Sequence, residues 1–309
     1  MNLLLRTTLA VCLLAAGGGC SIRHIAINKI GNALASGGST FETDDDPELV
    51  AAAVPFGLKF YESLLAESPR HAGLLLAASS GFTEYAYAFV DQSADEVREE
   101  SFDRSKALRE RALKLYLRAH RYGMRGLESR YPGFTAALDN DAVAALARVR
   151  KRDAALLYWT AASLGLAVSC SKSDPDMIAH LPLVEMIVDR VAQLDPGFDE
   201  GAVPEFRITL EAARSGVQPE DRQKAMRGRF EQALDLSGGK RAGVFVSLAE
   251  NASIPAQNPE EFRSLLEKAL AVDPDADPAN RLANLVAQRR ARWLLNHAND
   301  LFLETPKSQ

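Results

Sequence analysis

The feature that most constrains the fold is a helix ending that recurs along the chain. In each copy, apolar or small residues lie eight, five and four positions before a residue that stops a helix, which places them on one helix face. The four copies are Tyr61, Leu64, Leu65 and Ser68 before Pro69; Val188, Val191, Ala192 and Asp195 before Pro196; Phe230, Ala233, Leu234 and Ser237 before Gly238; and Leu266, Ala269, Leu270 and Asp273 before Pro274. A weaker fifth copy comprises Leu113, Tyr116, Leu117 and His120. Repetition of this kind indicates an array of similar helical units.

The second helix of a tetratricopeptide repeat (TPR) ends in this way, because a small residue lets the partner helix approach and Asp-Pro stops the chain. Gly238 follows Pro196 by 42 residues and Pro274 follows Gly238 by 36, against about 34 in the regular repeat. Strand-like alternation is not sustained anywhere. The sequence therefore predicts an all-α chain of degenerate TPR-like helical hairpins stacked into one solenoid-like body. An unrelated all-helical bundle is the alternative.

Individual helices follow from apolar periodicity and from breakers. Asp46 can cap the first helix, and Pro47 fits its first position, where no backbone N–H is needed. Helices are expected over residues 47–65, 70–90, 94–120, 139–165, 175–194, 199–214, 220–236, 259–272 and 278–302. Because no low-complexity linker divides residues 46–305, they are expected to form one domain.

The N-terminus has the pattern of a bacterial export signal. One cation, a short apolar stretch and three glycines precede Cys20, and such a stretch is too short to span a membrane. We expect residues 1–19 to be a lipoprotein signal peptide and residues 20–45 to be a lipidated N-terminus and spacer, with Cys20 as the lipidation site. Gly17 departs from the usual lipoprotein pattern, so a rival site at Cys12, cleavage without a lipid and an uncleaved anchor remain open. No later segment is expected to span a membrane.

Residue patterns typical of catalysis or metal binding are weak. The five histidines show no paired spacing, and the glycine and serine motifs of phosphate loops and hydrolases are missing. Cys170 is the single thiol expected after processing, so no internal disulfide can form. With a formal charge of -5 and scattered cations, the chain has no basic stripe for nucleic acid. We predict a non-enzymatic protein without metal or cofactor; a hydrolase with scattered residues is an alternative.

Aromatic residues crowd two of the expected helices. Phe82, Tyr85 and Phe89 share one face of a helix in "GFTEYAYAFV", and Tyr158 and Trp159 lie in "LLYWTAASLGLA" among small residues. Such side chains commonly form ordinary core. They can also line an apolar cavity, in which Tyr and Trp supply a polar tip. We therefore take these five residues as candidate ligand-binding residues.

Two longer stretches carry a family resemblance. The stretch "DDDPELVAAAVPFGLKFYESLLAESPRHAGLLLAASSGFTEYAYAFV", behind a signal that ends "GGGCS", and the later "LLYWTAASLGLAVSCSKSDPDMIAHLPLVEMIVDRVAQLDPGF" resemble the TatT lipoproteins. These are the T components of tripartite ATP-independent periplasmic (TRAP) transporters. The resemblance implies an all-helical periplasmic lipoprotein that forms homotrimers and has a cavity or pore through each subunit. It also implies docking of the solute-binding P component and transfer of a hydrophobic ligand, such as a fatty acid.

The predicted lipid anchor and repeats also lead to an expected location and to an alternative function. Ser21 after Cys20, in place of the Asp that favours inner-membrane retention, makes the outer membrane the more expected location. A TPR-like structural lipoprotein scaffold of the outer membrane or cell envelope would have the same repeats and the same anchor. The sequence alone does not separate this alternative from transport.

Overall fold

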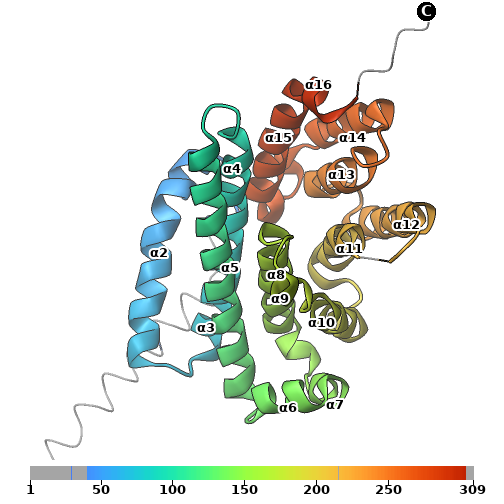
Figure 1. Cartoon of the computed structure of the whole chain (residues 1–309). Coiled ribbons are helices and arrows are strands. Elements are labelled where there is room, and N and C mark those ends of the chain that lie inside the picture. The colour runs from blue at the N-terminus through green and yellow to red at the C-terminus, as the bar shows by residue number, and fades with distance from the viewer. Residues whose placement is uncertain (1–28, 30–39, 215, 304–309) are drawn as a thin grey trace, which may run out of the picture.

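The structure, a computed structural model, describes residues 29, 40–214 and 216–303. Within these ranges the regular structure is entirely helical and contains no strand, so the all-α prediction is confirmed (Figure 1). The predicted signal peptide and Cys20 lie outside the described residues. The spacer from residue 20 to residue 45 is described only at residue 29 and from residue 40 onward.

The α-helices in chain order are α2 (Pro47–Glu67), α3 (Ala72–Ala86), α4 (Gln92–Glu96), α5 (Phe102–Arg130), α6 (Phe134–Asn140), α7 (Ala142–Ala147), α8 (Ala154–Cys170), α9 (Pro175–Ile178), α10 (Leu181–Leu194), α11 (Ala202–Ala213), α12 (Pro219–Ser237), α13 (Ala242–Leu248), α14 (Pro259–Ala271), α15 (Arg281–Asn296) and α16 (Ala298–Leu301). Two π-helical turns, η1 (Tyr87–Asp91) and η4 (Ala249–Ser253), extend α3 and α13. Short 3₁₀ turns are η2 (Lys151–Asp153), η3 (Phe198–Gly201), η5 (Pro274–Ala276) and η6 (Pro278–Asn280).

Most helices pack against their neighbours along the chain. α2 contacts α3, α3 contacts α5, α5 contacts α8, and α8 contacts α10. In the C-terminal half, α11 packs on α12, while α13, α14 and α15 contact one another. This order is consistent with stacked helical hairpins. Figure 1 shows α2, α3 and α5 along one side and the later helices curving round until α15 lies beside α4.

The recurring endings place most of the helix ends correctly. Asp46 caps α2 by accepting a hydrogen bond from the Leu49 N–H at 2.9 Å, as the sequence predicts. α2 ends at Glu67, α10 at Leu194 and α14 at Ala271, each shortly before the predicted proline, and α12 ends at Ser237. Gly238 follows α12 with a φ of 57°, a left-handed conformation that glycine adopts without strain.

The fifth ending was wrong, because α5 continues from His120 to Arg130. No proline or glycine breaker follows His120, and its Nδ1 lies 3.0 Å from the Thr160 carbonyl of α8. The break expected after Val90 was also wrong, because η1 carries the chain from α3 into α4 as a continuous helical segment.

The helix expected over residues 139–165 is interrupted between α7 and α8. The reason is Arg190 on α10, whose guanidinium donates to the carbonyls of Leu146, Ala147 and Val149 at 2.9 to 3.3 Å. These acceptors at the end of α7 are therefore satisfied without another helical turn. In contrast, the short helix α13 and its extension η4 were not expected at all.

Two described helices are long and apolar enough to cross a membrane by length and composition alone, contrary to the sequence-based expectation. They are Pro47–Glu67 and Lys151–Cys170. The second is mostly buried within the protein, as a core helix of a soluble domain is. The first leaves Leu49, Phe56 and Phe60 exposed on its outer face.

The tightest packing brings α5 against both α3 and α8. A Cβ atom at Gly123 of α5 would lie 2.2 Å from the Thr160 Oγ1 of α8 and 3.0 Å from the Ser79 Oγ of α3. Thr160 is held in place because its hydroxyl donates to the Leu156 carbonyl at 2.6 Å. Small side chains and the glycines of α5, Gly123 and also Gly126 against Leu156, therefore set the spacing of these three helices.

Gly123→Ala should lower the free energy of unfolding by about 1–2 kcal/mol, because overpacking outweighs the better helix propensity of alanine. Gly228→Ala on α12 is the matched control, since no atom lies within 4 Å of its added Cβ. There the propensity gain of about 0.5–1 kcal/mol should appear as added stability. Urea denaturation measures both effects, and a stabilising Gly123→Ala would contradict the packing argument.

Candidate functional site

Two polar side chains combine solvent access with enclosure by the protein. Glu84 near the end of α3 is exposed, and Tyr87 in η1 is 42% exposed. Even so, surrounding protein desolvates both groups, which raises the pKa of Glu84 to about 7 and raises the pKa of Tyr87 above its ordinary value. Both side chains therefore reach the surface while protein packs densely around them. We call the surface around Glu84 and Tyr87 the interior face.

Charges from the other half of the chain reach this interior face. After desolvation, the next contributions to the raised pKa of Glu84 come from Glu42 and from Asp199 in η3. The pKa of Tyr87 is raised next by Glu250 in η4. Groups far apart in sequence therefore act on one another across the same space. Within the described residues, Glu84 has no hydrogen-bond or ion-pair partner.

Arg241 organises the side of the interior face that belongs to η3 and α11. Its guanidinium binds the Glu205 carboxylate at 3.2 Å, and it contacts both the carbonyl and the carboxylate of Asp199 at 3.1 and 3.3 Å. Asp199 and Glu200 have φ values of 44° and 49°, in the left-handed region that residues other than glycine seldom adopt. A strained backbone conformation of this kind persists only where neighbouring contacts stabilise it. Asn280 supplies a second hold by donating to Glu200 at 3.1 Å.

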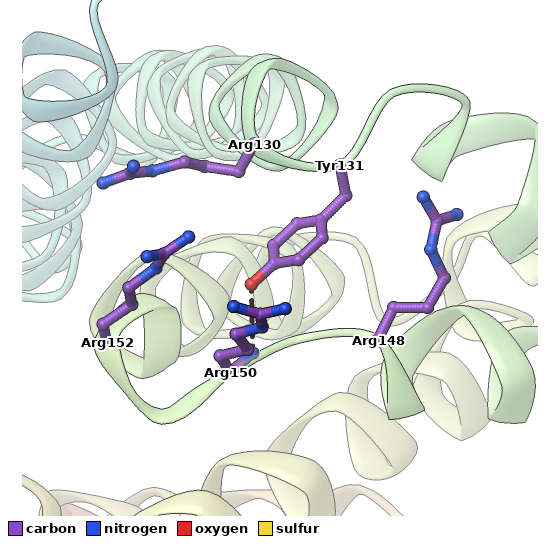
Figure 2. Close-up of a pocket in the computed structure, with 5 residues that line it drawn as sticks. All are labelled: Arg130, Tyr131, Arg148, Arg150 and Arg152. Atoms are coloured by element: carbon purple, nitrogen blue, oxygen red, sulfur yellow. Dashed lines mark hydrogen bonds between the residues drawn. The ribbon is translucent and has the colours of Figure 1, made fainter.

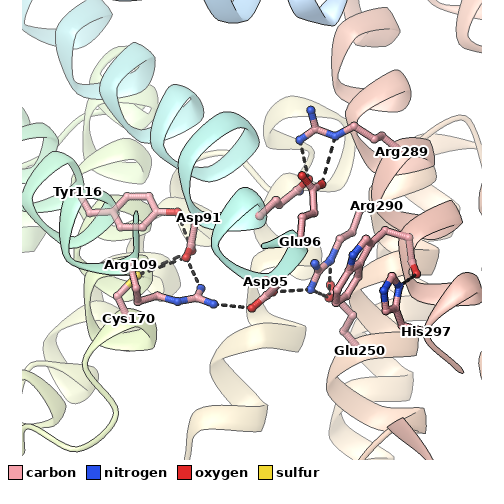
Figure 3. A network of polar contacts seen from close by, with 12 residues as sticks. Asp91, Asp95, Glu96, Arg109, Tyr116, Cys170, Glu250, Arg289, Arg290 and His297 are labelled. Atoms are coloured by element: carbon pink, nitrogen blue, oxygen red, sulfur yellow. Dashed lines mark hydrogen bonds and ion pairs between the residues drawn. The ribbon is translucent and has the colours of Figure 1, made fainter. Parts of the chain in front are cut away.

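A cluster of ion pairs joins α15 to the first third of the chain (Figure 3). The Arg290 guanidinium binds Asp95 of α4 at 2.8 Å and Glu250 of η4 at 2.6 Å. The neighbouring Arg289 donates to the Ala88 carbonyl at 2.6 Å and pairs with Glu96 at 3.6 Å. We call Arg289, Arg290 and their carboxylate partners the closing clasp. It fixes the last long helix against η1 and α4, next to Tyr87.

A second closing contact lies at the start of the described chain. The Leu282 N–H of α15 donates to the Glu42 carbonyl at 3.0 Å, and Arg281 donates to the Thr43 carbonyl at 2.9 Å. The segment that leads into α2 therefore packs against the start of α15. Together with the clasp, these contacts tie α15 to the N-terminal part of the described chain.

Cys170 lies in a half-buried polar group that adjoins the clasp. Its Sγ is 3.7 Å from both oxygens of Asp91, which also accepts hydrogen bonds from Tyr116 and Arg109. Burial, followed by the charge of Asp91, raises the pKa of the Cys170 thiol to about 12. The thiol therefore stays protonated near neutral pH, which is the opposite of an activated nucleophile.

The five predicted aromatic residues form two groups. Phe82 is buried against Tyr122, with ring centroids 5.8 Å apart. Tyr85 and Phe89 pack together at 5.9 Å, and the Arg289 guanidinium lies over the Phe89 ring at 5.9 Å. These three therefore belong to the side of α3 and η1 that meets α5 and α15.

Tyr158 and Trp159 make up the second group, on α8. Their ring centroids are 5.2 Å apart, and Tyr158 also contacts Phe198 at 4.9 Å and Phe206 at 6.2 Å. Tyr158 is buried, whereas Trp159 is half-buried. The charges of Glu205 and Asp199 add to the desolvation that raises the pKa of Tyr158. This group therefore lies at the interior face, while ligand contact by all five residues stays a prediction.

The charged members of the site were not predicted from the sequence. Glu84 is the one charged residue in the quoted aromatic stretch, which was the available signal for it. Arg289 and Arg290 lie in a helix with two other arginines, so nothing in the sequence distinguishes them. Their partners could not be named, because they lie on helices distant in the sequence.

Comparison with known proteins gives the family. The sequence profile described as "TRAP transporter T-component" matches residues 43–302. The chain belongs to the TRAP transporter T-component family. A protein of Treponema pallidum (strain Nichols), described as "Uncharacterized protein", is 32% identical over 313 residues, which covers 96% of each chain.

Membership of the T-component family places this chain among the accessory components of TRAP transporters. The match spans all the long helices from α2 to α15, including both ends of the closing clasp. The recognition made from the two quoted stretches is thereby confirmed. Accessory components of this class are not enzymes, and their association is with a transporter.

Removing the clasp arginine should destabilise this T-component family member. Arg290→Met leaves Glu250 without a cationic partner among the described residues, whereas Asp95 keeps Arg109; both carboxylates are only about one-quarter exposed. We expect the free energy of unfolding to fall by about 2–3 kcal/mol, measured by urea denaturation. Lys59→Met removes an exposed lysine whose partner, Glu62, keeps Arg118 and Tyr122, so it should cost less than about 0.5 kcal/mol. Equal losses in the two variants would contradict the structural importance of the clasp.

Glu84 should make stability depend on pH. Folding raises the pKa of Glu84 from 4.5 to about 7, so the folded state binds this proton more tightly than the unfolded state does. The stability that this tighter binding contributes is fully present below pH 4.5 and is lost as the pH rises through about 7. Glu84→Gln stays neutral, so it should match the parent near pH 4.5 and exceed it by about 1 kcal/mol at about pH 8, a figure reduced for solvent screening. Urea midpoints across this range measure the difference.

Glu99→Gln, in the exposed turn after α4, controls for the loss of one negative charge. A parent and a Glu84→Gln variant whose stabilities differ by the same amount at every pH would contradict the enclosed position of Glu84.

Proposed function

We propose that this protein is the periplasmic T component of a TRAP transporter, that it docks the periplasmic solute-binding protein, and that it passes a hydrophobic ligand through its interior. In this proposal Cys20 carries the lipid that anchors the chain, with the outer membrane as the more expected location. The work is binding and transfer, with no covalent step and no cofactor.

The observation that carries the proposal is that the chain belongs to the T-component family, and the interior face supports it. Glu84 and Tyr87 are accessible there although protein surrounds them. A passage for a ligand needs such an accessible interior, whereas a scaffold that only displays an outer surface does not. The aromatic pair Tyr158 and Trp159 supplies apolar area with polar tips at the same place.

Ion pairs neutralise most of the charge along the proposed path of an apolar ligand. The closing clasp and Arg241 tie up Asp95, Glu250 and Glu205, so these charges are compensated within the wall. A passing acyl chain would then meet aromatic rings and neutralised ion pairs. Below its pKa of about 7, Glu84 is neutral too and presents no charge to a carboxylate headgroup.

We also propose that the protein forms a homotrimer, as the family resemblance implies. The exposed Leu49, Phe56 and Phe60 give α2 an apolar outer face. Large apolar side chains gathered on one helix face often mark a protein–protein contact. An assembly that covered this face would remove it from water.

Affinity purification of the full-length protein from its native envelope should recover a periplasmic solute-binding protein. Native mass spectrometry of the recovered complex should then report a diacylated Cys20, three copies of the chain and a bound lipid or fatty acid. A Cys20→Ala variant controls for the anchor, since it should stay soluble and still bind the partner.

Repeated recovery of cell-envelope structural proteins without any solute-binding protein would overturn the transport proposal. That result would favour the alternative, a TPR-like structural lipoprotein scaffold of the outer membrane or cell envelope.

A further inference from the structure

Four arginines gather at the end of the molecule where α5 turns into α6 (Figure 2). Arg130 comes from the last position of α5, and Arg148, Arg150 and Arg152 come from the connection between α7 and α8. Together with Tyr131 they line a surface hollow of about 430 Å³. In Figure 2, Arg148 lies on one side of the Tyr131 ring and Arg130 and Arg152 lie on the other.

The base of this hollow is held by hydrogen bonds. The Tyr131 hydroxyl donates to the Asp153 carboxylate at 2.6 Å and accepts from the Arg150 backbone N–H at 3.0 Å. Tyr131 and Asp153 are both buried. Arg190 secures the same connection from behind through the carbonyls at the end of α7. The four guanidinium groups therefore extend from a fixed backbone.

Charge in the hollow is far from balanced. Asp153 is the carboxylate that pairs with these arginines, through the Nε atoms of Arg130 at 3.2 Å and Arg152 at 3.4 Å. Four guanidinium groups and one carboxylate leave an excess of three positive charges. Nearby carboxylates are already engaged: Glu128 caps the backbone N–H groups of Gly133 and Thr135, and Asp195 pairs with Lys151.

Many guanidinium donors also lack acceptors. Within the described part of the chain, the Arg150 guanidinium has no hydrogen-bond or ion-pair partner. Arg148 donates to the Pro132 carbonyl at 3.2 Å and has no other side-chain partner among the residues that the structure describes. Because Arg130 and Arg152 use Nε toward Asp153, their terminal amino groups stay open. Such planar donor forks bind oxyanions in a bidentate manner.

We propose that this hollow is a binding site for a phosphate monoester, a doubly charged oxyanion that would compensate most of the excess charge. The hollow is concave and within the size range of small-ligand sites. The positive charge is local, since the chain as a whole carries a formal charge of -5. The site is separate from the interior face and is not needed for the transport proposal.

The phosphate monoester could come from two sources, a water-soluble phosphate ester or the headgroup of a lipid such as phosphatidic acid. Isothermal titration of the full-length protein at low salt and about pH 8 distinguishes them. Three probes are titrated: inorganic phosphate, glycerol 3-phosphate and dioctanoyl phosphatidic acid below its micellar concentration. Similar affinity for the last two assigns the site to soluble esters, and at least about tenfold tighter binding of phosphatidic acid assigns it to the lipid.

The variant Arg148→Gln/Arg150→Gln should weaken binding of the best probe by about tenfold or more, because two charge-assisted donors are lost. Arg150→Lys should give an intermediate loss, since it keeps the charge and loses the fork. The matched control is Arg104→Gln/Arg263→Gln, which removes two exposed arginines that have no side-chain partner in the described residues. An unchanged urea midpoint verifies that the variants are folded.

Three results would overturn the proposal: no heat of binding with any phosphate probe at millimolar concentration, equal binding of chloride at matched ionic strength, or equal weakening in the control variant. Each would show that the hollow attracts anions only as a general positive surface. Failure here leaves the transport proposal standing, because that experiment measures recovery of a solute-binding protein.

Discussion

The structure depends on how closely α5 approaches α3 and α8. At Gly123 no side chain separates the helices, and Thr160 and Ser79 occupy the space where a Cβ would stand. Dispersion contacts fall off steeply with distance, so this small-residue contact gives three helices an interface that larger side chains would spread apart. α10 then packs on α8, and the rest of the array follows in order. The spacing at the glycines of α5 thus sets where the later helices can lie.

The interior face follows from that packing combined with charge. The charge of Asp199 in η3 acts on Glu84, the charge of Glu205 in α11 acts on Tyr87, and Arg241 compensates both carboxylates. A desolvated carboxylate is costly unless it is paired or protonated. Glu205 is paired, whereas Glu84 has no partner among the described residues and instead has a pKa of about 7. The interior face therefore contains two kinds of carboxylate. Glu205 stays charged in a fixed ion pair, and the charge of Glu84 varies near neutral pH.

The sequence predicted the helical class and most helix ends because these depend on neighbours in the chain. Breakers such as Pro69 and Gly238 act locally, so they can be recognised without a structure. The break after Ala147 could not be predicted, since it depends on the Arg190 side chain of another helix. α13 was missed because a buried helix of seven residues is too short to show a helical period. The partners of Arg290 are set by tertiary contacts, which periodicity does not encode.

Closure by α15 changes how an array of repeats can come apart. An open solenoid loses its terminal units first, because each unit contacts only the units beside it. Here the last long helix is bonded to Thr43 and to Asp95, so both ends of the array are protected by each other. Fraying from one terminus would have to break contacts at the opposite terminus as well. Unfolding in this protein should accordingly behave as a single all-or-none event, and shortening either end should weaken the whole.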